Sequence, residues 1–242
     1  MKTKQIIIFL LFLMVLLGCK SQLKNTSNTG EFVNENDSIN LFAFIGEKIS
    51  VIEFDPNADI EKRQAITKGI DEETGDSVNI VQQHYIMDSG FRCKYKIVKN
   101  IFNHLPNDTI EFIAYDHYGK PGFAEKDTVI LYLSKNKIEN YYFHQKYQYD
   151  NVFKDEKGNY FSYPKFPGTH YSKYKDSING FKINLKNEKY ILQDYLSKET
   201  IKALYPNEFY KIKGKTAFPI KGIYLNELFN FRLKSMFKDL QK

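Results

Sequence analysis

The segment from Phe91 to Ile97 constrains the fold more than any other part of the chain. In the order Phe91-Arg92-Cys93-Lys94-Tyr95-Lys96-Ile97, apolar residues alternate with cationic ones. A period of two places the apolar side chains on one face of a β-strand and the charged side chains on the other. We therefore predict a half-buried strand over residues 91–102, with Cys93 as a buried structural thiol on its apolar face.

Similar short runs recur along the middle of the chain, and residues typical of turns separate them. The predicted strands cover residues 41–54, 78–87, 91–102, 109–115, 128–133, 141–153 and 160–163. Gly46 predicts a bend in the first of them. The polar, acidic segment 55–75 is predicted to be a loop. Several strands at short spacing favour a mainly β domain over residues 39–165, built as an antiparallel barrel or sandwich.

The pattern changes after about residue 165. A strand is predicted over 181–185, and Ser197 is suited to cap a short helix that ends before Pro206. Residues 225–240 carry apolar side chains at helical spacing beside several lysines. We predict an α+β extension, residues 166–242, that packs on the β domain and ends in an amphipathic helix. Contact of that helix with a lipid surface is the alternative.

The N-terminus has the three parts of an export signal. Lys2 and Lys4 precede an apolar run from Ile6 to Leu17, which is too short to span a membrane as a helix. Leu16-Leu17-Gly18-Cys19 follows, and it resembles the lipobox of bacterial lipoproteins at all four positions. The resemblance implies a signal peptide over residues 1–18 and acylation of Cys19, with palmitate among the acyl groups. An ordinary cleaved signal with an incidental cysteine is the alternative.

A polar tether is predicted over residues 19–38, because this segment is rich in Asn, Ser and Thr and lacks apolar periodicity. As a random coil, the 18 residues from Lys20 to Asp37 would span roughly 25 Å. The body would therefore lie close to a membrane of the bacterial cell envelope, held by the lipid on Cys19. No acidic cluster follows Cys19, which favours a body that faces the periplasm.

Charge and cysteine content exclude some function classes. The chain carries 35 Lys and Arg against 29 Asp and Glu, a net charge of +6. Without Lys2 and Lys4 the balance is 33 against 29, or +4, spread along the chain. Outside the cytoplasm a nucleic-acid partner is not expected. With Cys19 acylated, Cys93 has no cysteine to pair with, so the core must supply the stability.

Part of the β domain resembles a known family. Phe44-Ile45-Gly46-Glu47-Lys48-Ile49 looks like the first strand of netrin-like domains, which are OB-type barrels. The hairpin 91–115 and the strand Val129–Leu133 look like later core strands of that family. The resemblance covers about residues 41–153 and implies an OB-like barrel. The family's disulfide cysteines are absent, and its zinc-chelating N-terminal cysteine has no counterpart in the body, so no inhibitor activity is carried over.

Motifs for catalysis are absent from the sequence. It contains no G-x-S-x-G, H-E-x-x-H, P-loop, G-x-G-x-x-G or C-x-x-C pattern, and we assign no catalytic residue, cofactor or metal. Asp116 and His117 lie in a predicted turn and are candidate contacts, with His144 as a possible partner; a solvated turn is the alternative. Tyr163, Tyr171 and Tyr174 follow in a segment interrupted by Pro and Gly, and are candidate ligand or partner contacts.

These features favour a binding or structural module for an envelope protein or glycan, of which an inhibitor or immunity protein is a specific form. The alternative is an envelope hydrolase of cell-wall or glycan bonds that would use Asp116 and His117. The identity of the partner is not encoded in any recognisable motif.

Overall fold

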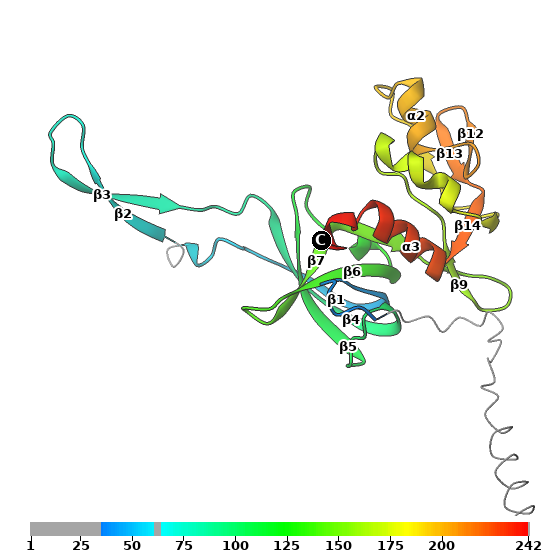
Figure 1. Cartoon of the computed structure of the whole chain (residues 1–242), viewed down its shortest axis with the longest axis horizontal. Coiled ribbons are helices and arrows are strands. Elements are labelled where there is room, and N and C mark those ends of the chain that lie inside the picture. Colours follow the sequence, from blue (N-terminus) through cyan, green and yellow to red (C-terminus); the bar gives the residue numbers. More distant parts are fainter. Residues whose placement is uncertain (1–34, 61–63, 242) are drawn as a thin grey trace, which may run out of the picture. The chain divides into compact units, whose positions relative to one another are not determined.

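The computed structural model describes residues 35–60 and 64–241 (Figure 1). The predicted signal peptide, Cys19 and the tether as far as residue 34 lie outside the described residues. The described chain is mainly β, which confirms the predicted class. Among its helices, none is long and apolar enough to cross a membrane.

Five strands form a closed ring in the order β1-β4-β5-β7-β6, with β6 pairing again with β1. They are β1 (Phe42–Phe54), β4 (Ser89–Phe102), β5 (Thr109–Asp116), β6 (Thr128–Asn136) and β7 (Tyr141–Asn151). Neighbouring strands are antiparallel except β5 and β7, which are parallel. A short 3-10 helix, η2 (Gly122–Glu125), lies between β5 and β6.

Alternation along the strands fills the inside of the ring. On β4, Phe91, Cys93 and Tyr95 are buried, whereas Arg92 and Lys96 are exposed. Cys93 is therefore the buried thiol that its alternation predicts, and burial raises its pKa to about 12. The other buried residues of this interior cluster are Phe44, Leu105, Ile110, Phe112, Ala114, Phe123, Ala124, Val129, Leu131 and Leu133.

Gly46 allows β1 to bend into the ring. The β1–β4 register shifts between Ile45 and Gly46. A Cβ atom at Gly46 would lie 2.9 Å from the Phe44 ring and 3.0 Å from the Tyr95 ring. Only glycine leaves room for these two aromatic rings, which is the physical reason for the predicted bend at this residue.

Strand β6 is buried on both faces. Val129, Leu131 and Leu133 point into the ring, and Ile130 and Tyr132 belong to a second hydrophobic cluster. That second cluster joins the outside of the ring to the C-terminal part of the chain. A strand buried on both faces reads as a continuous apolar run, as residues 129–133 do.

The C-terminal part consists of small sheets and short helices. One sheet has the order β10-β14-β9-β8 and another has the order β11-β13-β12. The strands are β8 (Phe153–Lys154), β9 (Tyr160–Ser162), β10 (Phe181–Lys182), β11 (Tyr190–Ile191), β12 (Tyr210–Lys213), β13 (Thr216–Pro219) and β14 (Lys221–Tyr224). The helices are η3 (Thr169–Ser177), α2 (Lys198–Leu204), α3 (Leu225–Ser235) and η4 (Lys238–Gln241). Ser197 caps α2 by accepting the Thr200 N–H.

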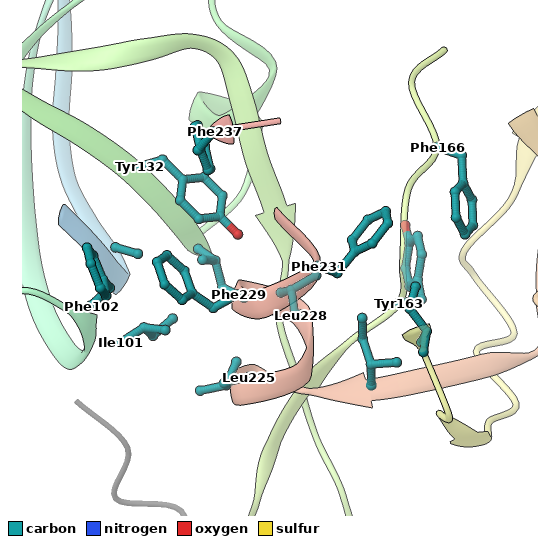
Figure 2. Close-up of a cluster of buried hydrophobic side chains, with 14 of the residues drawn as sticks. Ile101, Phe102, Tyr132, Tyr163, Phe166, Leu225, Leu228, Phe229, Phe231 and Phe237 are labelled. Atoms are coloured by element: carbon teal, nitrogen blue, oxygen red, sulfur yellow. The ribbon is translucent and has the colours of Figure 1, made fainter. Parts of the chain in front are cut away.

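Helix α3 packs its apolar side on the ring (Figure 2). Phe229 stacks on Phe102 of β4 at 4.6 Å between ring centroids, and Phe237 lies 5.0 Å from Tyr132 of β6. Arg232 of α3 forms a buried ion pair with Asp150 of β7, and the Tyr132 hydroxyl donates to the same carboxylate at 2.8 Å. Aromatic packing and one ion pair therefore hold α3 against the strands.

Strands β2 (Gln64–Ile70) and β3 (Ser77–Gln83) form a separate two-stranded antiparallel hairpin. The loop predicted over 55–75 was wrong for Gln64–Ile70, which pair with β3 residue by residue. In the described chain, β2 pairs with no strand other than β3 (Figure 1). The hairpin lies in the connection from β1 to β4.

The pH dependence of stability should reveal the buried histidine of β7. His144 is 7% exposed, packs 4.5 Å from Phe123 and donates an Nε2–H to the Gln148 carbonyl at 2.8 Å. Burial lowers its pKa to about 4, from 6.5 in the unfolded chain. Between these values the unfolded chain binds more protons. The free energy of unfolding therefore has its full value above pH 6.5. It falls by up to about 3 kcal/mol as the pH drops to 4.

Urea denaturation at pH steps from 4 to 7 measures this loss. The His144→Gln variant removes the titrating ring, so its curve should be flatter than the parent curve over the same range. Parallel curves for the two proteins would contradict the buried, neutral histidine.

Candidate functional site

The β2–β3 hairpin exposes apolar side chains on both faces. Its register places Ile66, Ile70 and Val81 on one face and Val78 and Ile80 on the other. All five are exposed, and Ile70 retains 74% of its accessible surface. A lone two-stranded ribbon is marginal in water, and natural proteins usually protect strand edges with charges or proline. On these two strands Lys68 is the one charged residue. The composition of the hairpin is typical of a surface that a binding partner covers.

The tip of the hairpin is acidic. The turn from Asp71 to Asp76 carries four carboxylates, so residues 64–83 have a net charge of −3 once Lys68 is counted. Asp71 Oδ1 accepts the backbone N–H groups of Thr74 (3.0 Å) and Glu73 (2.9 Å), and these bonds lower its pKa. The four carboxylates therefore lie on an ordered turn, and the lowered pKa of Asp71 keeps its side chain ionised at neutral pH.

The base of the hairpin is pinned to the end of β1. Asn57 donates to the Ile86 carbonyl at 2.8 Å and accepts the Ile86 N–H at 2.9 Å. A cleft of about 450 Å³ lies beside this pair, lined by residues 53–57 and 86–89. Met87 at its rim is 80% exposed, and Tyr85 is also exposed. Both side chains are types that are enriched at protein interfaces.

Asp88 joins the hairpin base to the middle of β7 and to the residue after β5. Its carboxylate binds Lys146 of β7 at 2.5 Å and lies 3.4 Å from His117 Nδ1, which follows β5. The hydrogen bond from Lys146 lowers the pKa of Asp88. Tyr118, which is 86% exposed, lies edge-on to His117, and its ring is 6.1 Å from that of Tyr147. We call the β2–β3 hairpin, Tyr85, Met87, Asp88, His117 and Tyr118 the hairpin surface.

The structure separates the roles of Asp116 and His117. Asp116 is nearly buried and accepts the Tyr118 N–H at 2.9 Å, so its carboxylate stabilises its own turn. His117 is half exposed and pairs with Asp88. His144, the possible partner of His117, lies buried inside the ring. Within residues 35–60 and 64–241, no three His, Cys, Asp or Glu side chains are placed to hold a metal.

The three candidate tyrosines belong to the C-terminal cluster. Tyr171 and Tyr174 lie on η3 and are partly buried against the second hydrophobic cluster. Tyr163 is 1% exposed, and its hydroxyl donates to Glu188 Oε2 at 2.7 Å. It lines a second cleft of about 480 Å³, which we call the Tyr163 cleft. The lining residues are Gly122, Glu125, Lys126, Tyr147, Gln148, Tyr149, Asn151, Tyr163, Lys165, Pro167, Glu188, Lys189, Tyr190, Arg232 and Met236.

Tyr147 connects the two regions through an unusual backbone. It has a φ of 64°, in the left-handed region that bulky residues avoid. Its ring contacts Tyr118 of the hairpin surface, and the same residue lines the Tyr163 cleft. Such strain persists where the surroundings impose it, and it is common at functional sites.

The sequence predicted His117 of the hairpin surface and Tyr163 of the cleft, but the other residues of both sites were missed. Residues 78–87 were predicted to be a strand, which the structure has over Ser77–Gln83, but nothing in the sequence marked residues 64–70 as its partner. The cleft draws residues from five separate segments of the chain, so no spacing within one segment could reveal it.

Comparisons of the chain with protein-family models, with curated proteins and with solved structures found no match.

Exposed hairpin residues should be dispensable for folding. Ile66→Asn should change the free energy of unfolding by less than about 0.5 kcal/mol, because its side chain has almost no core contacts to lose. Ile130→Ala, a change at a fully buried position of β6, should cost about 2–5 kcal/mol. Chemical denaturation of both variants tests this contrast, and a loss at Ile66 comparable to that at Ile130 would contradict it.

Proposed function

We propose that this protein is a lipoprotein of the bacterial cell envelope whose body is a protein-binding module. The observation that carries the proposal is the β2–β3 hairpin, which displays five exposed Ile and Val side chains on two faces. Isolated exposed apolar residues are ordinary, but a clustered set on an otherwise unpaired ribbon is typical of an interaction site. The lipobox-like Leu16–Cys19 supports anchoring through a lipid on Cys19, with the body in the periplasm.

The proposal includes an OB-type fold for the ring, related to netrin-like domains. With the hairpin strands left out, the ring order becomes first, second, third, fifth and fourth strand, closed by pairing of the first with the fourth. The third and fifth strands are the parallel pair. In OB folds, the loop between the first two strands is one of the usual ligand-binding loops. The hairpin occupies this loop. Its position therefore supports a binding role by analogy with other OB folds.

The partner that the hairpin fits best is a protein with a cationic surface beside an apolar groove. The hairpin carries −3, so opposite charge would orient the partner toward the tip, while Ile66, Val81 and Ile80 supply apolar contact. Tyr118 and Met87 at the base add the residue types that often dominate binding energy at interfaces. A second copy of this chain is the competing occupant, because the remainder of the chain is basic.

The lipid anchor can be tested separately from binding. Wild-type protein should partition with membranes and incorporate labelled palmitate, and Cys19→Ala should do neither, because the sulfur is the acceptor of the lipid. Metabolic labelling and fractionation measure both. The control is Cys93→Ala, which changes the buried thiol and should retain both properties. Palmitate in Cys19→Ala would contradict the anchor assignment.

Binding is tested by a photo-crosslinking residue placed at Val81 in the cells that produce the protein. We expect one heterologous adduct. It should be lost when Ile66→Asn is combined with Ile80→Asn, and weakened when Glu72 and Glu73 become lysine, because the first change removes apolar contact and the second reverses the charge. The matched control places the same photoresidue at Ile191, an exposed isoleucine of β11.

Three results would overturn the proposal. They are no adduct from position 81, the same adduct from position 191, or an adduct with the mass of two copies of this chain. The last would assign the hairpin to self-association.

A further inference from the structure

The Tyr163 cleft has the size and lining of a small-molecule site. The protein-binding role proposed for the hairpin surface assigns no role to this cleft. Its volume of about 480 Å³ falls within the roughly 300–1,000 Å³ that is usual for such sites. Tyrosine rings, amides and charged groups of both signs share the lining. We propose that the cleft binds a saccharide that carries one carboxylate group.

The first argument is the state of Lys165. Its Nζ donates to the Tyr149 carbonyl at 3.1 Å, and among the described residues it makes no other hydrogen bond. Asp150 lies 4.0 Å away, but both of its oxygens already bind Arg232 and one also accepts from Tyr132. An ammonium has three N–H donors. Lys165 therefore keeps donors for a ligand anion, and burial lowers its pKa only to about 8, so it is charged at neutral pH.

The second argument is the charge balance around the cleft. Lys126, Lys165, Lys189 and Arg232 face Glu125 and Glu188, with Asp150 directly behind Arg232. Four cations against three carboxylates leave a single positive charge. One carboxylate on the ligand matches this balance, whereas a polyphosphate would meet the acidic groups as well.

The third argument is a fixed set of polar groups on another wall. Glu188 Oε2 accepts from Tyr163 at 2.7 Å and from Asn151 at 2.8 Å, and the Tyr163 and Tyr190 hydroxyls lie 2.9 Å apart. Glu188 Oε1 accepts no hydrogen bond from the described residues. It provides an acceptor for a hydroxyl group, and it is held in place before any ligand arrives.

The fourth argument is the aromatic share of the lining. Tyr147, Tyr149, Tyr163 and Tyr190 contribute to the cleft, and Tyr147 is half exposed at its edge. Rings of tyrosine offer flat apolar faces with polar ends, which suit the C–H faces and hydroxyl edges of a sugar ring. A purely apolar ligand would offer no hydrogen bond to Glu188 Oε1 or to the remaining N–H donors of Lys165.

Calorimetry with the full-length protein, purified in detergent, tests the proposal with three probes at equal ionic strength. D-glucuronate carries both the sugar ring and the carboxylate, D-glucose lacks the carboxylate, and acetate lacks the ring. We expect D-glucuronate to bind at least tenfold more tightly than either of the others. Lys165→Gln should weaken D-glucuronate binding at least tenfold, and Lys186→Gln, an exposed lysine outside the lining, should leave it within twofold.

Each other result overturns a stated part of the inference. Equal affinity for D-glucose would show that the cleft does not recognise the carboxylate. Equal affinity for acetate would show that the cleft is a general anion site that does not recognise the sugar ring. No binding of D-glucuronate, or unchanged binding in folded Lys165→Gln, removes the site. If Lys165→Gln does not fold, Lys189→Gln takes its place, because it removes an exposed cation of the same lining. It should weaken D-glucuronate binding severalfold, and unchanged affinity would overturn the proposal.

Discussion

The buried pair of Asp150 and Arg232 is the interaction on which the arrangement of the molecule depends. Asp150 is fully buried on β7, and a carboxylate left alone there would cost several kcal/mol. Among the described residues, Arg232 and Tyr132 donate the side-chain hydrogen bonds that Asp150 accepts, so α3 must sit where its arginine reaches β7. Replacing such a pair with apolar residues often leaves the stability of a fold unchanged. We therefore infer that the main effect of this pair is to specify where α3 packs. It selects one position of α3, and that position stacks Phe229 on Phe102 and brings Arg232 to the wall of the Tyr163 cleft.

Elements that bury one or both faces could be predicted from sequence. The alternation in β4 and the continuous apolar run in β6 are direct traces of burial, and both strands lie where they were expected. The predicted loop over 55–75 failed for the same reason. No residue of β2 whose burial is described belongs to the core, so the strand shows neither alternation nor an apolar run. Strands β12 to β14 were also missed, since four-residue strands such as Tyr210–Lys213 and Lys221–Tyr224 are too short to show a period.

Functional residues were harder to predict than the fold, because contacts between distant segments decide their roles. Cys93 could be judged inert from its own strand. Asp116 and His117 are neighbours in sequence, yet one stabilises its turn and the other pairs with Asp88, which lies 29 residues before His117. Tyr163 was a candidate for its place in a loop. Its hydroxyl is instead buried in a network with Glu188, Asn151 and Tyr190, a combination that only the folded chain assembles.

The independence of the β2–β3 hairpin from the core bears on how this protein changes over generations. Substitutions at the buried positions of the ring and of α3 are constrained by packing, since those side chains form the two hydrophobic clusters. Ile66, Ile70 and Val81 carry no such constraint. Selection on the binding that we propose for the hairpin can therefore act without selection on folding, and it would act on about twenty residues between two anchor points. The hairpin sequence can therefore change without altering the packing of the ring.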